Sequence, residues 1–345
     1  MISSKLLSLA GIVFVGLALS VAITASAAVR PAHQGPPLPT AASGAEVRVV
    51  ARGIPTPTAF AFGEGQMFVG AFGDERNPKV TGGVYLVRGG RPARLPGSPA
   101  HVVGLAYRTG TLYVSECGCG APSRILAWSG WNGHRFTKSR VVVTGPKNFT
   151  GFNGIALDRD STLYAGVSVG NRKQDDYSSG KTRYANSVVA IDPASGEISI
   201  VATGMRQPWQ PVFVPGHRGA LVADLGQENL GKKRPVDRIV EVRKGADFGF
   251  PACPAKPAAC ANYDKPFTIF PAHSSPMGLA ALRGRLYVAL FGGDGKGPEV
   301  VSMPLSGGKY RPALVGFAAP VVALGSQTGR IYVGDLTGSV YSSRP

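Results

Sequence analysis

Thr111-Leu112-Tyr113-Val114-Ser115 is one of six copies of a short β-type phrase that recurs along the chain. Each copy is rich in apolar, β-branched or aromatic residues, which favour strands. A second apolar run precedes each copy by about ten residues, and a turn rich in Gly, Asp or Arg joins the two. The pattern predicts six β-hairpins. The copies occupy residues 66–70, 111–115, 162–166, 220–224, 285–289 and 330–334.

The spacing between the copies predicts the fold. They recur at intervals of 45 to 65 residues, the length of a four-stranded propeller blade with variable loops. The last repeat offers only three strands, at residues 321–324, 330–335 and 339–343. The β-type segment at residues 46–51 is expected to supply the fourth, because pairing both chain ends in one blade removes an open sheet edge. The sequence therefore predicts an all-β, six-bladed β-propeller with an N-terminal strand closing the last blade.

The N-terminus predicts export. Lys5 precedes an apolar run over residues 6–23 and the small residues Ala25-Ser26-Ala27-Ala28, the pattern of a secretory signal peptide over residues 1–29. The apolar run is also long enough to span a bilayer, so an uncleaved anchor is the alternative. Residues 30–45 are Pro-rich and predict a linker, and residues 46–345 form the propeller. We expect a secreted or extracytoplasmic, monomeric protein.

The net positive charge of the chain predicts attraction to anionic partners. The formal net charge is +17, and loss of residues 1–29 would remove one basic residue, Lys5. Such a protein is attracted to anionic cell-envelope polymers. The basic residues are scattered over loops rather than gathered with aromatic residues on one helix, so no specific nucleic-acid partner is expected.

Four cysteines fit an exported protein. Cys253 and Cys260 bracket a Pro/Ala loop that a disulfide would staple. Cys117 and Cys119 flank only Gly118, an awkward spacing for a bridge between themselves. Three pairings are open, and a zinc site is disfavoured because there is no C-x-x-C spacing.

Propeller symmetry predicts where a ligand binds. Residues just ahead of each innermost strand should line one mouth of the channel, and in blades three to five they are polar or aromatic. A ligand is expected off-centre, towards Arg206 and His273. The predicted mouth residues are Thr56, Thr58, His101, Thr150, Phe152, Asn153, Arg206, Gln207, Trp209, Gln210, His273, Ser274, Ser275, Ala318 and Ala319.

Four stretches of blades four and five resemble the soluble quinoprotein glucose/sorbosone dehydrogenase family. They are GMRQPW at residues 204–209, ADLGQ at 223–227, DRIVEVRKGADFGFP at 237–251 and FPAHSSPMGLA at 270–280. The resemblance implies a propeller that binds pyrroloquinoline quinone (PQQ) with calcium. It also implies oxidation of a sugar or aldehyde by hydride transfer, with a His as the base.

The resemblance assigns roles to individual residues. Arg206, Gln207 and Trp209 match the cofactor side, where a guanidinium suits the carboxylates of the quinone. Asp224, Gln227 and Asp237 match the loops that supply calcium oxygens. Turn-capping roles for the two Asp residues are the alternative.

The chain departs from the family at two points. Thr150 stands where the family has its catalytic His, and Thr takes no proton at neutral pH, so His101 and His273 become the candidate bases. Ala318 and Ala319 stand in blade six where the family often places an Arg. A PQQ-dependent sugar or aldehyde dehydrogenase is therefore one interpretation, and a non-catalytic ligand- or cell-envelope-binding propeller is the alternative. A third is a gluconolactonase-like metal hydrolase, for which Asn153 resembles one metal ligand but a Glu and an Asp are missing.

The charge generates a first prediction. The purified protein should adsorb to an anionic envelope polymer at low salt and elute as the salt concentration rises, because the Debye length falls to about 8 Å near 0.15 M. Adsorption and elution along a salt gradient measure this. Retention that does not change with salt would point instead to a specific ligand or an uncleaved anchor.

Overall fold

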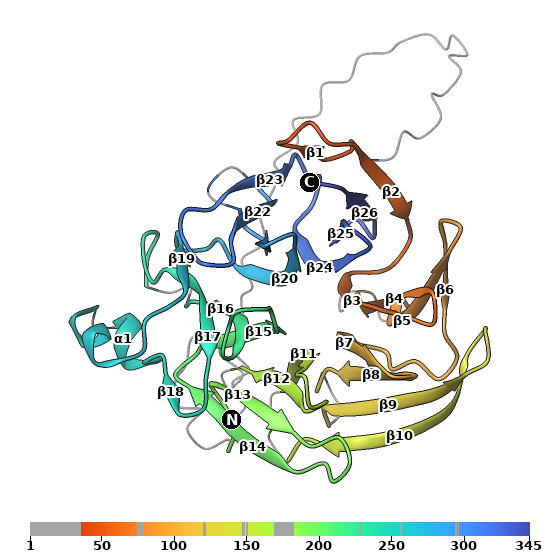
Figure 1. Cartoon of the computed structure of the whole chain (residues 1–345), viewed down its shortest axis with the longest axis horizontal. Coiled ribbons are helices and arrows are strands. Elements are labelled where there is room, and N and C mark those ends of the chain that lie inside the picture. Colours follow the sequence, from red (N-terminus) through yellow and green to blue (C-terminus); the bar gives the residue numbers. More distant parts are fainter. Residues whose placement is uncertain are drawn as a thin grey trace, which may run out of the picture. The chain divides into compact units, whose positions relative to one another are not determined.

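The computed structural model describes residues 36–74, 77, 79–119, 122–146, 149, 151–168, 183–227, 230–255, 257–293, 295 and 297–345. The chain divides into two units, residues 1–35 and 36–345. The predicted signal peptide lies outside the described residues. Within the second unit, the described residues form six sheets arranged around a common axis (Figure 1).

Each of the first three blades begins with its innermost strand and runs outward through an antiparallel meander. Blade 1 comprises β3 (Pro57–Gly63), β4 (Gln66–Gly73), β5 (Thr81–Arg88) and β6 (Arg91–Arg94). Blade 2 comprises β7 (Val102–Arg108), β8 (Thr111–Glu116), β9 (Arg124–Trp131) and β10 (Phe136–Thr144). Blade 3 comprises β11 (Phe152–Leu157), β12 (Leu163–Val167), β13 (Ser187–Ile191) and β14 (Ile198–Thr203).

The other three blades also run outward from their innermost strand, and blade 6 takes its outermost strand from the start of the described chain. Blade 4 comprises β15 (Gln207–Val212), β16 (Ala220–Leu225), β17 (Asp237–Val242) and β19 (Thr268–Phe270). Blade 5 comprises β20 (Pro276–Leu282), β21 (Arg285–Leu290), β22 (Glu299–Pro304) and β23 (Arg311–Val315). Blade 6 comprises β24 (Val321–Gln327), β25 (Arg330–Asp335), β26 (Val340–Ser343) and β2 (Val47–Ala51). All-β architecture with six blades, as predicted, is confirmed.

The sixth blade is built from two distant parts of the chain. β2 pairs antiparallel with β26, in a register that sets Val47 opposite Ser343 and Val49 opposite Tyr341. The strand expected at residues 46–51 thus lies at the outer edge of the last blade. Thr40–Ala41 (β1), within the segment expected to be a linker, pairs with β23 of blade 5.

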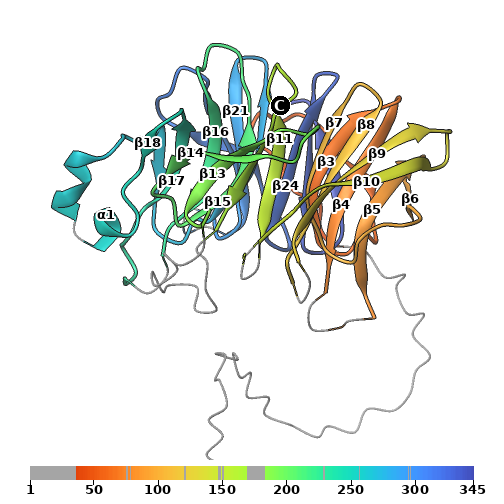
Figure 2. The ribbon, with the colours of Figure 1, turned by 90° about the horizontal axis from the view of Figure 1, so that it is seen from below.

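One excursion interrupts blade 4. Between β17 and β19 the chain forms β18 (Ala246–Asp247), the short helix α1 (Ala252–Ala255) and the 3-10 turn η2 (Pro257–Asn262). β18 pairs parallel with β14, so a segment of blade 4 completes the edge of blade 3. In Figure 2 this excursion lies at the left edge of the ring. No helix among the described residues is long and apolar enough to cross a membrane.

The hydrophobic core lies between the blades. Six apolar clusters of the described residues each combine side chains from two successive blades, and the last joins blade 6 to blade 1. Fully buried residues such as Phe68, Leu112, Leu163 and Leu221 belong to the recurrent phrase of the sequence. Burial of a large apolar side chain contributes about 1.5–3 kcal/mol to the stability of the fold. The recurrent phrase therefore decides the fold.

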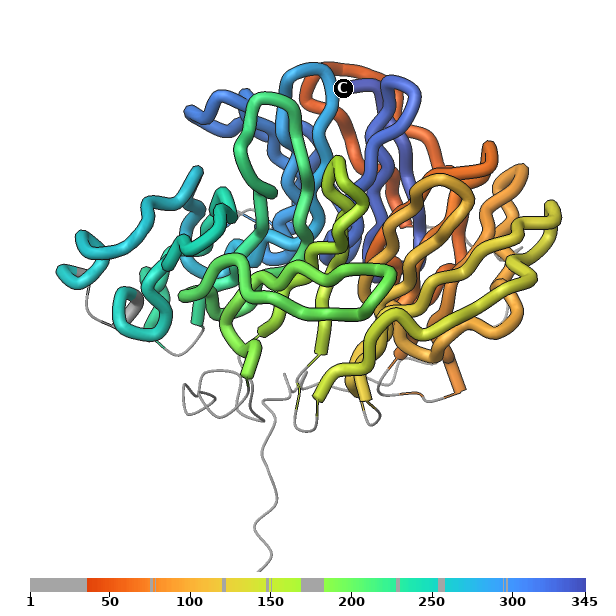
Figure 3. The backbone as a smooth tube through the Cα atoms, turned by 60° about the horizontal axis from the view of Figure 1, so that its bottom comes forward, coloured from red at the N-terminus to blue at the C-terminus, as the bar shows by residue number. Residues whose placement is uncertain are grey.

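Glycine allows the inner strands to approach closely. A Cβ atom on Gly104 of β7 would lie 2.8 Å from the Ile155 nitrogen of β11. On Gly278 of β20 it would lie 2.5 Å from the Leu324 nitrogen of β24. Each inner strand contacts the next around the ring, as the smooth trace of Figure 3 shows.

Two disulfides join the four cysteines, Cys117 to Cys119 and Cys253 to Cys260. The second pairing is the one that the sequence favoured. Cys117 and Cys119 pair despite their awkward spacing, because the loop after β8 holds their Cα atoms 5.3 Å apart, within the usual range.

The shared last blade generates a second prediction. Deletion of residues 30–52 removes β1 and β2, exposing the edge of β26 and part of the core between blades 6 and 1. We expect the free energy of unfolding to fall by about 3 kcal/mol or more, from lost ladder hydrogen bonds and apolar burial. Denaturant unfolding measures this. Deletion of residues 30–37, which keeps both strands, is the control, and equal stability of the two deletions would contradict the closure.

Candidate functional site

The candidate site is formed by three loops at the N-terminal ends of the inner strands of blades 4 and 5. They carry residues 204–206 ahead of β15, residues 226–236 between β16 and β17, and residues 271–275 ahead of β20. Six of the residues predicted from sequence lie in or beside these loops: Arg206, Gln207, Asp224, Gln227, Asp237 and His273. The structure therefore brings most of the predicted site together.

Asp224 forms a buried ion pair. Its Oδ2 accepts a hydrogen bond from Arg238 Nε at 2.8 Å, and its Oδ1 accepts one from the Gln207 backbone N–H at 3.0 Å. Asp224 is 2% exposed. The Arg238 guanidinium also donates to the carbonyls of Phe248 and Gly204. This ion pair ties three segments of blades 3 and 4 together, and both oxygens of Asp224 are engaged.

Asp237 links blade 4 to blade 5. Its Oδ1 accepts the Gly226 N–H at 2.6 Å, and its Oδ2 accepts the Ser275 N–H at 2.7 Å. Burial raises the pKa of Asp237 above its ordinary value, and the nearby negative charge of Asp224 acts in the same direction. Asp237 thus holds the two loops on either side of it.

Arg206 lines a pocket rather than facing open solvent. It is 2% exposed, and its Nη1 donates to Gln207 Oε1 and to the Gly226 carbonyl, both at 3.0 Å. The pocket has a volume of about 240 Å³. Three arginines and one aspartate line it together with apolar residues. Its lining residues are Arg206, Asp224, Gly226, Arg234, Pro235, Val236, Arg238, Phe250, Cys253 and Cys260.

Trp209 faces a different environment. Its ring packs with Leu225, Met277, Val322 and Phe291. Its Nε1–H is buried and meets no acceptor among the residues that the structure describes. Because an unpaired buried donor is costly, this N–H suits an oxygen atom of a bound molecule.

The two candidate bases lie in different surroundings. His273 is exposed and precedes Ser275, whose N–H binds Asp237; its Nε2 lies 3.1 Å from the Gly231 carbonyl. His101 Nδ1 lies 2.7 Å from the Phe72 carbonyl of blade 1, and the His101 ring packs against the Phe72 ring. A carbonyl oxygen only accepts hydrogen bonds, so in each ring the nitrogen beside the carbonyl is the donor. Of the two, only His273 borders the loops that hold Arg206.

Thr150 and Asn153 are the residues on which the departure from the family and the metal-hydrolase interpretation depend. Thr150, at the family's catalytic position, lies outside the described residues. Asn153 donates through Nδ2 to Ser168 Oγ at 2.7 Å and to the Pro208 carbonyl. Asn153 therefore fastens blade 3 to blade 4.

The carboxylates show little capacity for calcium. Each oxygen of Asp224 and Asp237 already accepts a hydrogen bond, and Gln227 is buried. No group of three or more His, Cys, Asp or Glu is placed to hold a metal ion within the described ranges. The donor set is that of a structural network rather than of a hard-cation site.

Comparison with solved structures places the fold. No protein-family model and no curated protein matches the sequence. A glucose dehydrogenase-type oxidoreductase from Thermus thermophilus aligns with a TM-score of 0.66 at 20% identity, covering 87% of this chain and 100% of that one. The PQQ-bound aldose sugar dehydrogenase from Streptomyces coelicolor aligns at 0.67 and 17%, covering 88% and 99%. The chain has the fold of the soluble sugar dehydrogenases.

A structure described as a gluconolactonase has the same architecture, with a TM-score of 0.59 at 15% identity, covering 89% of this chain and 97% of that one. Six-bladed propellers of both kinds are thus structural neighbours of the chain. At such identities the likeness establishes the fold, and function has to be argued from the site.

The sequence did not single out Arg238 and Arg234. Arg238 stands beside Asp237 in the motif that carried the resemblance, and a buried Asp on the neighbouring strand needed a cationic partner. That requirement could have identified Arg238. Arg234 could not be found in this way, because it enters the pocket through the path of the loop ahead of β17.

Asp237 generates a third prediction. Because its pKa is raised, the native protein binds this proton more tightly than the unfolded chain does, so its contribution to stability falls as the pH rises above about 3.8 through the raised pKa. The difference in free energy of unfolding between wild type and Asp237→Asn should therefore decrease from pH 3.5 to pH 6.

Denaturant unfolding across this pH range measures the difference. Asp192→Asn is the control of opposite sign, because a hydrogen bond from the Ala194 N–H lowers the pKa of Asp192. Its contribution to stability is present above pH 3.8 and is lost as the pH falls. Parallel curves for wild type and Asp237→Asn would contradict the prediction.

Proposed function

We propose that this protein is a ligand-binding propeller whose pocket beside Arg206 takes a small organic anion with an apolar body. The observation that carries the proposal is the lining of this pocket. Arg238 is paired with Asp224, so Arg206 and Arg234 give the pocket an excess of positive charge. Guanidinium groups pair with carboxylates through two parallel hydrogen bonds, and apolar walls cover the body of a ligand.

PQQ, a flat quinone that carries carboxylates, has the chemistry that this lining suits. Arg206 and Arg234 would hold the carboxylates, and Phe250 and Pro235 would cover the ring. When bound, the quinone would supply a hydride acceptor. Calcium has less support, because each oxygen of the carboxylates that would bind it already accepts a hydrogen bond. We therefore propose quinone binding that needs no calcium.

Oxidation of a sugar or aldehyde is the second candidate function. Two observations favour it: the PQQ-bound aldose sugar dehydrogenase has this fold, and His273 presents a nitrogen that can accept a proton. Its Nε2–H donates to Gly231, which leaves the Nδ1 lone pair for the substrate proton. Trp209 Nε1–H would donate to a substrate oxygen. The metal hydrolase has less support, since the sequence lacks the Glu and the Asp that such a site needs beside Asn153.

We infer that the protein acts outside the cytoplasm. Two disulfides are consistent with an oxidising compartment, and residues 1–29 supply the predicted signal. In such a location the basic surface would add attraction to anionic envelope polymers.

A titration with PQQ, with and without calcium, tests the binding function. Ligand at a hundred times its Kd raises the free energy of unfolding by about 2.7 kcal/mol, so the melting temperature of the mature protein should rise equally in both series. Arg234→Ala should weaken PQQ binding by roughly tenfold or more, since a hydrogen bond to a charged group contributes about 1.5–3 kcal/mol. Arg234 is exposed, so its replacement should not unfold the protein.

Arg91→Ala, an exposed arginine of β6 in blade 1, is the matched control and should bind PQQ as the wild type does. Absence of binding, or equal losses in both variants, would contradict the proposed site. Dye reduction with aldoses at saturating PQQ then tests oxidation. If turnover occurs, His273→Ala should lose far more rate than His101→Ala; equal rates in wild type and His273→Ala would exclude His273 as the base.

A further inference from the structure

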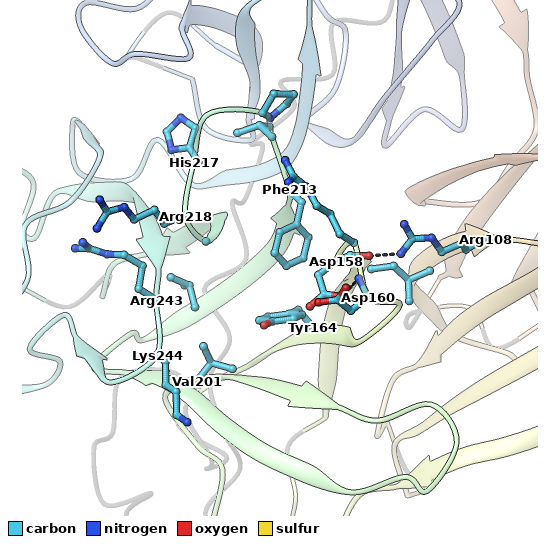
Figure 4. A pocket seen from close by; sticks show the side chains of 16 residues that line it. Arg108, Asp158, Asp160, Tyr164, Val201, Phe213, His217, Arg218, Arg243 and Lys244 are labelled. Carbon is cyan, nitrogen blue, oxygen red and sulfur yellow. Dashed lines mark hydrogen bonds between the residues drawn. The ribbon is translucent and has the colours of Figure 1, made fainter.

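A second pocket lies at the opposite end of the blades from the Arg206 site. It is formed by the turn between β11 and β12, the turn between β15 and β16, and the end of β17, and it has a volume of about 720 Å³. These turns follow the inner strands, whereas the Arg206 loops precede them. Figure 4 shows the pocket with Phe213 and Tyr164 at its centre. We call it the 3/4 pocket, after the two blades that form it.

The 3/4 pocket is strongly cationic. Among the described residues that line it, five are basic and two acidic: Arg108, Arg159, Arg218, Arg243 and Lys244 against Asp158 and Asp160. The β16–β17 ladder explains part of this gathering. Ala220 pairs with Val242. Arg218, just before β16, therefore lies close to Arg243 and Lys244, which directly follow β17.

The loops of the 3/4 pocket are held by contacts that leave most cationic groups unused. Glu241 Oε1 accepts the backbone N–H groups of Arg218 and Gly219, at 2.8 and 3.3 Å. Asp158 Oδ1 accepts the N–H groups of Asp160 and Thr162, both at 2.9 Å.

Two of the five cationic side chains are engaged within the protein, and three remain available to a ligand. Arg108 donates to the Asp158 carbonyl, and Arg243 is 3.6 Å from Asp264 with half of its side chain exposed. Within the described part of the chain, no hydrogen bond or ion pair engages the side chains of Arg159, Arg218 and Lys244. The framework is thus fixed while these charged groups stay available to a ligand.

An aromatic pair forms the apolar part of the 3/4 pocket. The rings of Phe213 and Tyr164 meet edge to face, with centroids 4.9 Å apart at 81°. Burial raises the pKa of Tyr164, and the charges of Asp158 and Asp160 act in the same direction. The Tyr164 hydroxyl therefore remains a hydrogen-bond donor at neutral pH.

We propose that the 3/4 pocket binds an acidic saccharide of the uronic acid class. The aromatic pair would contact the C–H face of a sugar ring, and Arg218, whose side chain has no hydrogen bond or ion pair among the described residues, would bind its carboxylate. Asp160 and Tyr164 would bind the hydroxyl groups. The two Asp residues disfavour a ligand that is anionic throughout, such as a polyphosphate, and favour one that combines a single charge with many hydroxyl groups.

Calorimetric titration with digalacturonic acid at 0.15 M salt tests the proposal. We expect saturable binding, at least about tenfold tighter than that of the neutral disaccharide maltose or of inorganic phosphate, because neither supplies both a carboxylate and a sugar ring. Phosphate that binds as tightly as digalacturonic acid would overturn the proposal in favour of non-specific anion attraction, and maltose that binds as tightly would overturn the role of the charge.

Substitutions locate the site. Arg218→Ala should weaken binding by about tenfold or more, and Phe213→Leu by about fivefold, since it removes the aromatic face. Arg91→Ala removes the same charge from blade 1 and should leave the Kd unchanged. An unchanged Kd in both Arg218→Ala and Phe213→Leu, with melting temperatures confirming folded variants, would overturn the assignment.

Arg234→Ala separates this site from the Arg206 pocket. It should leave the Kd for digalacturonic acid unchanged, and Arg218→Ala should leave PQQ binding unchanged. Loss of digalacturonic acid binding in Arg234→Ala would overturn the 3/4 pocket as its site. Failure of PQQ to bind has no bearing on this outcome.

Discussion

Packing between blades is the constraint on which the rest of this structure depends. No blade buries its own apolar face: every large cluster of the described residues takes side chains from two neighbours. The ring is therefore complete only when the sixth sheet is complete, and that sheet needs β2 from the beginning of the described chain. Glycines such as Gly104 and Gly278 let the inner strands meet backbone to backbone at the axis. This packing between blades therefore fixes where the loop residues lie.

The polar residues of blade 4 serve the fold as well as any ligand. Asp224, Arg238 and Asp237 connect the strands of blade 4 with the loops beside them, and their hydrogen bonds use both oxygens of each carboxylate. Removing one partner of such a buried set leaves an uncompensated charge, which costs about 3–5 kcal/mol. A structural role of this kind accounts for these three residues without a bound cation. It also explains why Arg206 stands at the wall of a pocket, with its guanidinium oriented by Gln207 and Gly226.

Much of the fold follows from sequence periodicity, and less of the site does. The recurrent phrase contains the residues that pack between blades, so it predicts the number of blades and the place of each hairpin. The grouping of Arg206, Asp224 and Asp237 followed from the motif of blade 4. Their hydrogen-bond partners did not, because the Gly226 and Ser275 N–H groups are backbone atoms that any sequence would supply. The 3/4 pocket was also not predicted: its cations come from turns far apart in sequence, gathered by the register of β16 and β17. Likewise, the Cys117–Cys119 bridge depends on a loop conformation that spacing alone does not reveal.

The excursion through β18 has a consequence for how the ring comes apart. Because β18 leaves blade 4 and pairs with β14 of blade 3, the two blades are interleaved rather than merely adjacent. Arg238 reinforces this by binding the Gly204 carbonyl between β14 and β15. Blades 3 and 4 should thus open as one cooperative unit in native-state hydrogen exchange. The segment that carries β1 and β2 likewise pairs with both blade 5 and blade 6, so protein engineering should leave these two boundaries intact.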